Sequence, residues 1–390
     1  MSDPVVRIAA RGDGVTASGR HVPLAAPADV LLEDGSLEAG PHRQLPPCRH
    51  FPECGGCQLQ HVDDAAYRQY LVDRVSGALA QHGLATAIRE PHLSPPRSRR
   101  RASLHALRTG KGVAIGFHAE RSHRVIDMRE CHILRPELFA LVGPLRTLLA
   151  PLLKPRSAGQ VHLTLCDQGV DLALGGVTIE GLDATEALTR FAERQRLARL
   201  SVDEGFGSEV RYEPQPATVT LSGTAVALPP GGFLQATADG EAALVAAVRE
   251  ALAGAEQIAD LFSGLGTFAL ALPGKVYAAE AGRAAWLSLK SARPAIAAEH
   301  RDLYRRPLSE AELGSFDAVV LDPPRAGAAA QVRELAGSSL PRIAYVSCNP
   351  ATFARDARVL ADGGYRLQWV RPVGQFRWSI HVELAACFER

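Results

Sequence analysis

The chain has 390 residues and a mass of 41.6 kDa, is 46% hydrophobic and 22% charged, and balances 43 Lys and Arg against 42 Asp and Glu. This composition excludes disordered, collagen-like and coiled-coil classes, and the length suits two or three domains. The most apolar stretch, residues 138–153, is interrupted by Arg146 and two prolines, so it does not predict a membrane span. The N-terminus lacks the apolar region of a signal peptide. We therefore expect a cytoplasmic monomer with no membrane partner.

Charge is unevenly distributed along the chain. Residues 41–135 contain 15 Lys and Arg against 8 Asp and Glu, together with 9 of the 13 histidines. Such a local excess is typical of a surface that binds a polyanion, although a solvated face would give the same balance. Arg97, Arg99, Arg100 and Arg101 are candidates for phosphate contacts. Because aromatic residues make up only 6% of the chain, backbone charge with one captured base is favoured over an aromatic stacking platform.

The first two-thirds of the chain give mixed signals. Residues 1–45 read as short strands separated by turns, and residues 63–82 have helical periodicity with Tyr67, Leu71, Val75 and Leu79 on one face. Residues 161–166 and 170–176 alternate as strands do, and residues 184–200 predict a charged helix. We expect a short β segment over residues 1–45 and a β-rich central domain over residues 46–230.

The last third of the chain has a clear pattern. A helix is predicted over residues 241–253, and strands are predicted over residues 257–261, 275–280, 316–321 and 342–347, with helices between them and two final strands. Alternating strands and helices give a parallel sheet covered by helices on both faces. Residues 231–390 are therefore predicted to form a doubly wound, Rossmann-like α/β domain.

A glycine loop follows the first strand of this domain. Asp260 begins a segment that contains Gly264 and Gly266 and is predicted to open a helix, so a ligand could approach the backbone there. Glu280 closes the next strand, twenty residues after Asp260, where a carboxylate can accept hydrogen bonds from ribose hydroxyls. The third glycine of the dinucleotide fingerprint is absent, which favours a nucleoside such as S-adenosylmethionine over NAD. A tight turn without a ligand is the alternative.

Three further groups follow later strands. Asp322 precedes two prolines at the end of the third strand, and Cys348 follows the fourth strand close to a helix N-terminus. A thiolate in such a position tends to have a lowered pKa and to be nucleophilic, whereas an isolated buried cysteine would be inert. His381 and Glu383 are predicted to share one face of a late strand. Glu383 matters if it can reach a base held against Cys348.

Three cysteines lie close together in the central domain. Cys48, Cys54 and Cys57 are separated by five and then two residues, a spacing that suits an iron–sulfur cluster or structural zinc. A fourth ligand would come from the remaining candidates, which are Cys131, Cys166, His50 and His61. The spacing does not distinguish zinc from iron.

Seven motifs occur in one order along the chain: CRHFPECGGCQLQH (48–61), MRECHIL (128–134), GGFLQAT (231–237), DLFSGLGTF (260–268), DPPRAG (322–327), SCNPATFARD (347–356) and HVE (381–383). In this combination the chain resembles the S-adenosylmethionine-dependent RNA uracil-5 methyltransferases, in particular the iron–sulfur-containing branch that acts on 23S ribosomal RNA. The resemblance covers nearly the whole chain. It implies RNA as the partner, with ribosomal RNA favoured over transfer RNA.

The resemblance also implies roles for individual residues. Cys48, Cys54, Cys57 and Cys131 would hold a [4Fe-4S] cluster. S-adenosylmethionine would be bound by residues of the last domain, which are Gln235, Asp260, Phe262, Gly264, Gly266, Glu280 and Asp322. Cys348 would be the nucleophile and Glu383 the general base. The competing interpretations are an RNA cytosine-5 methyltransferase and a non-catalytic iron–sulfur RNA-binding module.

The chain departs from the family pattern in three places. Only 47 residues precede Cys48, which is short for the family's N-terminal TRAM barrel and predicts a truncated TRAM- or OB-like segment. Thr237 stands where many members have Asn, and Gly374 stands where Asp is common. We expect the last two departures to affect the geometry near the site more than the type of reaction.

Overall fold

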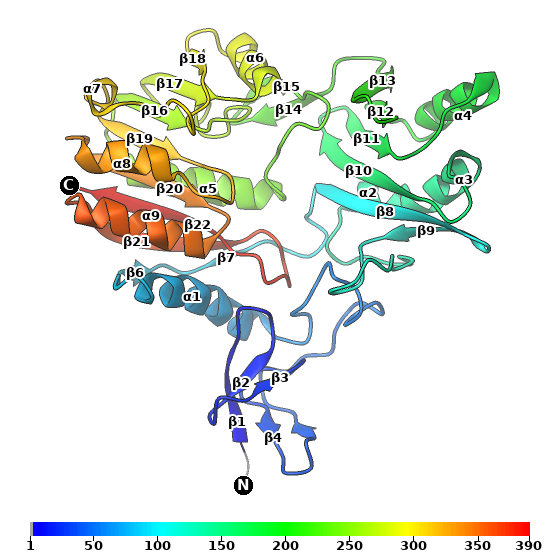
Figure 1. Ribbon diagram of the computed structural model, residues 1–390, viewed down its shortest axis with the longest axis horizontal. Coiled ribbons are helices and arrows are strands. Elements are labelled where there is room, and N and C mark those ends of the chain that lie inside the picture. Colours follow the sequence, from blue (N-terminus) through cyan, green and yellow to red (C-terminus); the bar gives the residue numbers. More distant parts are fainter. Residues whose placement is uncertain (1–2) are drawn as a thin grey trace.

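The computed structural model describes residues 3–390, and over these residues the chain forms four β-sheets (Figure 1). The predicted segment 1–45 begins with two residues that lie outside this range. Its remainder is an open antiparallel sheet of order β3-β2-β1-β4-β5, which confirms a short N-terminal β segment. The strands are β1 (Asp3–Ile8), β2 (Gly14–Thr16), β3 (His21–Val22), β4 (Val30–Leu31) and β5 (Leu37–Glu38).

A six-stranded sheet of order β13-β12-β11-β10-β8-β9 forms the central part of the chain. Its strands are β8 (Arg101–Thr109), β9 (Gly112–Gly116), β10 (Ala158–Cys166), β11 (Gly169–Gly175), β12 (Arg199–Asp203) and β13 (Ser208–Tyr212). Its helices are α2 (Pro136–Ala140), α3 (Val142–Leu152) and α4 (Gly181–Arg194). Leu104 and Leu163 of the sheet share a core with Leu145 of α3 and Phe191 of α4. The helix predicted over residues 184–200 is therefore too long, because it ends at Arg194 and β12 begins at Arg199.

The largest sheet has nine strands and contains the C-terminal third of the chain. Strands β16 to β20 are parallel, and β22 pairs antiparallel with both β20 and β21. The strands are β16 (Gln257–Leu261), β17 (Lys275–Glu280), β18 (Ala297–His300), β19 (Ala318–Leu321), β20 (Arg342–Ser347), β21 (Arg366–Gly374) and β22 (Glu383–Glu389), together with β6 (Ala87–Ile88) and β7 (His92–Leu93). A hairpin of β14 (Thr218–Leu221) and β15 (Thr224–Ala227) precedes this region.

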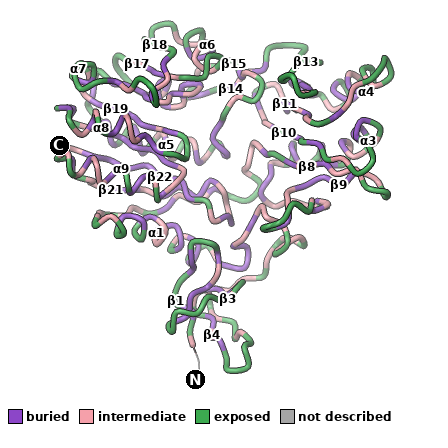
Figure 2. The backbone as a smooth tube through the Cα atoms, viewed as in Figure 1, coloured by how far each residue is buried: buried purple, intermediate pink, exposed green. Residues whose placement is uncertain are grey.

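Helices cover both faces of the nine-stranded sheet, so the predicted doubly wound arrangement is confirmed. They are α1 (Asp64–Ala80), α5 (Ala238–Ala251), α6 (Arg283–Ala292), α7 (Glu310–Leu313), α8 (Ala329–Gly337) and α9 (Pro350–Asp362). Along β20, Tyr345 packs into the core with Phe353 of α9, while Val346 packs into the opposite core with Leu244 of α5. Buried positions accordingly concentrate on the strands, and exposed positions on the outer sides of the helices (Figure 2).

Residues 64–93 belong to this part of the structure, because they contain one helix that packs on the nine-stranded sheet and two strands that pair with it. α1 packs against α9, and β6 and β7 pair parallel with β21. The Tyr67 hydroxyl of α1 donates to the carbonyl oxygens of Phe376 and Ser379, at 3.1 and 3.0 Å. The sheet thus includes strands from well before residue 231. Strands of two residues are too short to give a recognisable pattern in the sequence.

Two local predictions are wrong. The segment after the glycine loop is a series of turns over residues 262–272 instead of a helix, because Phe262, Gly264 and Gly266 all have positive φ (66°, 56° and 94°). His381 precedes β22, which begins at Glu383, so the two residues do not alternate along one strand. β18 was also not predicted.

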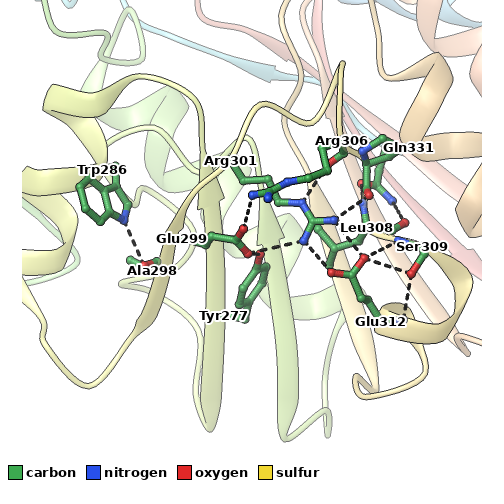
Figure 3. A network of polar contacts seen from close by, with 11 residues as sticks. Tyr277, Trp286, Ala298, Glu299, Arg301, Arg306, Leu308, Ser309, Glu312 and Gln331 are labelled. Atoms are coloured by element: carbon green, nitrogen blue, oxygen red, sulfur yellow. Dashed lines mark hydrogen bonds and ion pairs between the residues drawn. The ribbon is translucent and has the colours of Figure 1, made fainter.

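A polar network fixes the edge of the sheet beside β17 (Figure 3). The Arg301 guanidinium donates to both carboxylate oxygens of Glu312, at 2.7 and 2.9 Å, and this lowers the pKa of Glu312 to about 2. The Arg301 amide donates to the carbonyl oxygen of Glu280 at 2.9 Å. The network therefore holds the chain after β18 against the end of β17.

Candidate active site

The predicted donor and catalytic residues of the last domain gather at one edge of the nine-stranded sheet. Asp260 lies in β16, Glu280 ends β17, and Asp322 and Cys348 directly follow β19 and β20. These four parallel strands are neighbours in the order β17-β16-β19-β20, so their carboxyl ends meet. This edge is where open α/β sheets bind ligands.

Glu280 shapes the glycine loop. Its carboxylate accepts hydrogen bonds from the amides of Gly264, at 2.9 Å, and Gly282, at 2.5 Å. The amides of Phe262 and Ser263 both donate to the carbonyl oxygen of Ala279, at 3.0 and 3.1 Å. The loop is therefore folded back onto β17. The Glu280 carboxylate retains lone pairs that a ligand hydroxyl could use.

Asp260 is a buried carboxyl with spare hydrogen-bonding capacity. Its Oδ2 accepts from the Ala269 amide at 2.7 Å, whereas its Oδ1 and the nearby Ser263 Oγ have no partner. Burial, with a smaller contribution from Asp322 and Glu280, raises the pKa of Asp260 to about 8. Burial raises the pKa of Asp322 to about 7. Unpartnered polar atoms and crowded carboxyls indicate a site for a polar, positively charged ligand.

Cys348 and Glu383 face a common cavity of about 440 Å³, which is also lined by Gln235. Burial, followed by the charges of Glu383 and Asp322, raises the pKa of the Cys348 thiol to about 11. The expectation of a lowered thiol pKa is therefore wrong for the ligand-free chain, because burial and two carboxyls raise it. Burial and the charge of Asp322 likewise raise the pKa of Glu383 to about 8.

Gln375 connects Gln235 with Glu383 and was not identified from the sequence. Its Nε2 donates to Gln235 Oε1 at 2.8 Å, and its Oε1 accepts from the Ala236 amide at 2.9 Å. A side-chain hydrogen bond from Gln375 also opposes the rise in the pKa of Glu383. The sequence signal for this residue is a glutamine in the PVGQF segment, between the last two predicted strands.

The motif SCNPATFARD holds the loop that follows Asp322. Asn349 Nδ2 and Thr352 Oγ1 donate to the carbonyl oxygen of Arg325, at 3.1 and 3.2 Å. Asp356, which is 1% exposed, accepts from the Ala328 amide at 2.8 Å and from the Tyr345 hydroxyl at 2.7 Å. The helix after Cys348 thus fixes the position of the neighbouring loop.

The departures at Thr237 and Gly374 have structural explanations. Thr237 is the N-cap of α5, and its Oγ1 accepts from the Gly240 amide at 3.0 Å, a role that Asn performs equally well. A Cβ atom on Gly374 would lie 2.8 Å from Leu93 Cδ2 and 3.0 Å from Leu71 Cδ1. Leucine side chains therefore fill the space that a residue with a side chain would need.

A second, much smaller cavity is lined by all four predicted cluster cysteines, Cys48, Cys54, Cys57 and Cys131. Burial raises the pKa of each thiol, that of Cys57 to about 12. Across residues 3–390, no three His, Cys, Asp or Glu side chains converge as ligands of a single metal ion.

The other candidate ligands are less well placed. Cys166 lies in β10, where its Sγ contacts the carbonyl oxygen of Gly169 at 3.2 Å. His50 lines the cavity, but its Nε2 accepts from the Arg129 amide at 2.9 Å. His61 is buried outside the cavity lining, and burial lowers its pKa to about 4.

Most of the basic run is committed to internal contacts. Arg100 pairs with Glu241 at 2.6 Å, and both side chains are largely buried. Arg101 donates to the Leu234 carbonyl oxygen at 2.9 Å and lies over the Phe233 ring. Arg99 lies over the Phe117 and Phe376 rings. Of the four arginines proposed to contact phosphates, only Arg97 is exposed.

No helix within residues 3–390 combines the length and apolarity needed to cross a membrane.

Comparisons with known proteins agree with this geometry. Over the full length of both chains, the fold resembles the crystal structure of Pyrococcus abyssi tRNA (uracil-54, C5)-methyltransferase in complex with S-adenosyl-L-homocysteine, with a TM-score of 0.73 and 23% identity. The likeness includes the nine-stranded sheet and supports the same overall fold. A family model described as tRNA (Uracil-5-)-methyltransferase matches residues 289–390.

Curated relatives cover much more of the chain. An uncharacterized RNA methyltransferase of Zymomonas mobilis is 49% identical over 99% of both chains. The 23S rRNA (uracil(1939)-C(5))-methyltransferase RlmD of Chromohalobacter salexigens is 33% identical over 89% of this chain and 76% of its own length. The chain belongs to the RNA uracil-5 methyltransferase family, as the motifs predicted. Its assignment to the 23S ribosomal RNA branch stays a prediction.

Proposed function

We propose that this protein transfers a methyl group from S-adenosylmethionine to C5 of a uridine in 23S ribosomal RNA, with Cys348 as the nucleophile and Glu383 as the general base. The observation that carries this proposal is that both side chains line one cavity at the carboxyl edge of the sheet. The ribosomal substrate is supported by the four cysteines around one cavity and by the 33% identical RlmD relative. The alternative, transfer RNA, is supported by the family model over residues 289–390 and by the fold likeness.

The chemistry requires a nucleophile because C5 of uracil is too weakly nucleophilic to take a methyl group directly. The Cys348 thiolate adds to C6, and the electron pair of the C5=C6 bond moves toward C5 and O4. C5 then attacks the methyl carbon, and S-adenosylhomocysteine leaves with the electrons of the S–CH₃ bond. Glu383 removes the C5 proton, the C5=C6 bond re-forms, and the Cys348 sulfur leaves as a thiolate.

The donor supplies a charge that the catalytic pair needs. The carboxylate of Asp322 raises the pKa of both Cys348 and Glu383. A positively charged sulfonium bound at this edge would offset the negative charge of Asp322, and Cys348 and Glu383 would then ionise more readily. Glu280 would accept hydrogen bonds from the ribose hydroxyls of the donor. The unpartnered Oδ1 of Asp260 would be available to a polar group of a donor bound at the glycine loop. The target uridine would have to leave its stack to enter the cavity.

We further infer that Cys48, Cys54, Cys57 and Cys131 hold a [4Fe-4S] cluster. When bound, the cluster would cross-link two distant segments of the chain through iron–thiolate bonds. The Gln58 and Leu59 amides, next to Cys57, donate to the carbonyl oxygen of Trp378 at 2.8 and 2.9 Å. The cysteine loop therefore braces the β21–β22 connection that leads to Glu383. Because methyl transfer moves no single electrons, this role is structural.

Tritium release tests the reaction and the substrate together. Anaerobically purified protein is incubated with S-adenosylmethionine and RNA carrying tritium at uracil C5, with ribosomal and transfer RNA in separate reactions. Release from ribosomal RNA alone is expected. Release from transfer RNA alone would retain the mechanism and overturn the substrate. Release from neither, by protein that binds donor, would favour a cytosine-5 methyltransferase or a non-catalytic RNA-binding module.

A further inference from the structure

Four histidines gather beside the substrate cavity; we call His105, His118, His123 and His162 the histidine surface. The rings of His105, on β8, and His118, after β9, are stacked with centroids 3.6 Å apart and planes 10° apart. The His123 ring meets that of His118 edge-on at 5.7 Å. Nδ1 of His162, on β10, is hydrogen-bonded to Ser103 Oγ at 2.9 Å. Three of them, His105, His118 and His123, belong to the histidine-rich basic region 41–135.

The histidine surface is continuous with the substrate cavity. Arg101 and Ser103 line the cavity, and His105 follows them on the same face of β8, because strand side chains alternate. Gly55 also lines the cavity, and its amide donates to the carbonyl oxygen of His118 at 2.9 Å. The surface therefore begins where the cavity opens.

This face of the central sheet is open within residues 3–390. The opposite face carries Leu104 and Leu163, which pack into the core with α3 and α4. On the histidine side, His123 and His162 are exposed, and His105 and His118 are partly exposed. The ribbon also shows α3 and α4 on the outer side of this sheet (Figure 1).

We propose that the histidine surface binds an unpaired nucleotide next to the target uridine, with its base stacked on the imidazole rings and its phosphate close to their N–H groups. The proposal rests on the proposed function, because a uridine drawn into the cavity leaves its flanking nucleotides at the mouth. Imidazole stacks on bases and donates hydrogen bonds to phosphate oxygens. Arg101, whose charge acts on His162, adds positive charge beside the surface, which complements RNA.

The charges around the surface predict how binding depends on pH. Burial and the other three histidines lower the pKa of His105, and burial and Arg101 lower the pKa of His162. On the adjoining segments, Glu53 pairs with Arg124 at 2.7 Å and Glu120 pairs with Arg121 at 3.6 Å. In the free protein, His105 and His162 are thus uncharged near neutral pH. A bound phosphate favours the protonated rings, so RNA affinity rises as the pH falls.

Fluorescence anisotropy with 5′-fluorescein-labelled decauridylate and the full chain tests the proposal at pH 6 and pH 8, at constant ionic strength. The double variant His105→Ala/His118→Ala is expected to bind about tenfold more weakly at pH 6, the size of effect that loss of base stacking produces. His105→Phe/His118→Phe keeps aromatic rings but cannot be protonated. It should bind like the wild type at pH 8 and lack the gain in affinity at pH 6. His82→Ala, in the turn after α1, serves as the control and should bind normally.

Binding by the double alanine variant within twofold of the wild type at both pH values would overturn the proposal. So would a phenylalanine variant that keeps the full gain in affinity at pH 6. Binding of S-adenosylhomocysteine checks that each variant is folded. Equilibrium binding needs no methyl transfer, so weakened RNA binding without any tritium release by the wild type would contradict the proposed function and still support the histidine surface.

Discussion

Cys348 and Glu383 are neighbours across the β20–β22 pair. Ser347 of β20 lies opposite Leu384 of β22 in the antiparallel register, so the residue after Ser347 adjoins the residue before Leu384. Each side chain lines the same cavity, and the charge of Glu383 contributes to the raised pKa of Cys348. Two strand ends thus carry the proposed nucleophile and the proposed base, and rigid elements hold such pairs more precisely than loops.

Replacing the nucleophile tests half of this pair. Cys348→Ala should lower tritium release by at least about a thousandfold, because no other group would attack C6. Binding of S-adenosylhomocysteine, measured by calorimetry, should stay within twofold of the wild type. The control is Cys387→Ala. Cys387 is buried in β22, and its Sγ lies 3.9 Å from the carbonyl oxygen of Ala251. Turnover by Cys348→Ala at more than a tenth of the wild-type rate would exclude the assignment.

Replacing the base should trap the reaction after methyl transfer. Glu383→Gln keeps a side chain that can bond to Gln375 but cannot take the C5 proton, so elimination of the thiolate stops. A covalent protein–RNA adduct that survives denaturing electrophoresis should accumulate with labelled RNA and S-adenosylmethionine. Glu389→Gln, at the other end of β22, should give no accumulation. The adduct should vanish in Cys348→Ala/Glu383→Gln; its absence from Glu383→Gln itself would contradict the role of Glu383.

Sequence patterns located the strands that carry the site because these strands are buried on both faces. β16, β17 and β20 have the predicted bounds, and each has a polar first residue, a mainly apolar middle, and an acidic or hydroxyl residue at or next to its last position. Which strand ends meet at one edge of a parallel sheet then follows from topology alone. That reasoning correctly anticipated where Asp260, Glu280, Asp322 and Cys348 would meet.

Features that depend on tertiary neighbours could not be predicted in this way. The thiol pKa of Cys348 is raised by burial and by Glu383 and Asp322. Gln375 acts through Gln235, 140 residues away in the chain. The stacking of His105 on His118 requires the β8–β9 hairpin and the segment that follows it. Neither local periodicity nor residue spacing carries this information.

The cysteine assignment predicts a spectroscopic loss. Cys131→Ser, purified anaerobically, should lose the visible absorbance of a [4Fe-4S] cluster and most of its iron and acid-labile sulfide, because a cluster ligand is removed. Cys166→Ser is the control, since Cys166 is a buried free cysteine that lies outside the cysteine cavity. Wild-type protein that contains zinc and no iron would overturn the cluster proposal and support structural zinc.

Asp260 predicts how stability depends on pH in the donor-free protein. The folded-state pKa is about 8, whereas the ordinary value is 3.8, so between these values the folded chain holds a proton that the unfolded chain has released. The free energy of unfolding should therefore fall as the pH rises through this window, by up to about 1.4 kcal/mol per pH unit for this one group.

Asp260→Asn keeps an acceptor for the Ala269 amide and cannot ionise, so its stability should decline less steeply between pH 5 and pH 8. Urea unfolding at fixed ionic strength measures both slopes. The remaining slope comes partly from Asp322 and Glu383, whose pKa values are also raised, to about 7 and about 8. Equal slopes for wild type and Asp260→Asn would mean that Asp260 is ionised in the folded protein, because only a group that changes its proton occupancy on unfolding contributes to the slope.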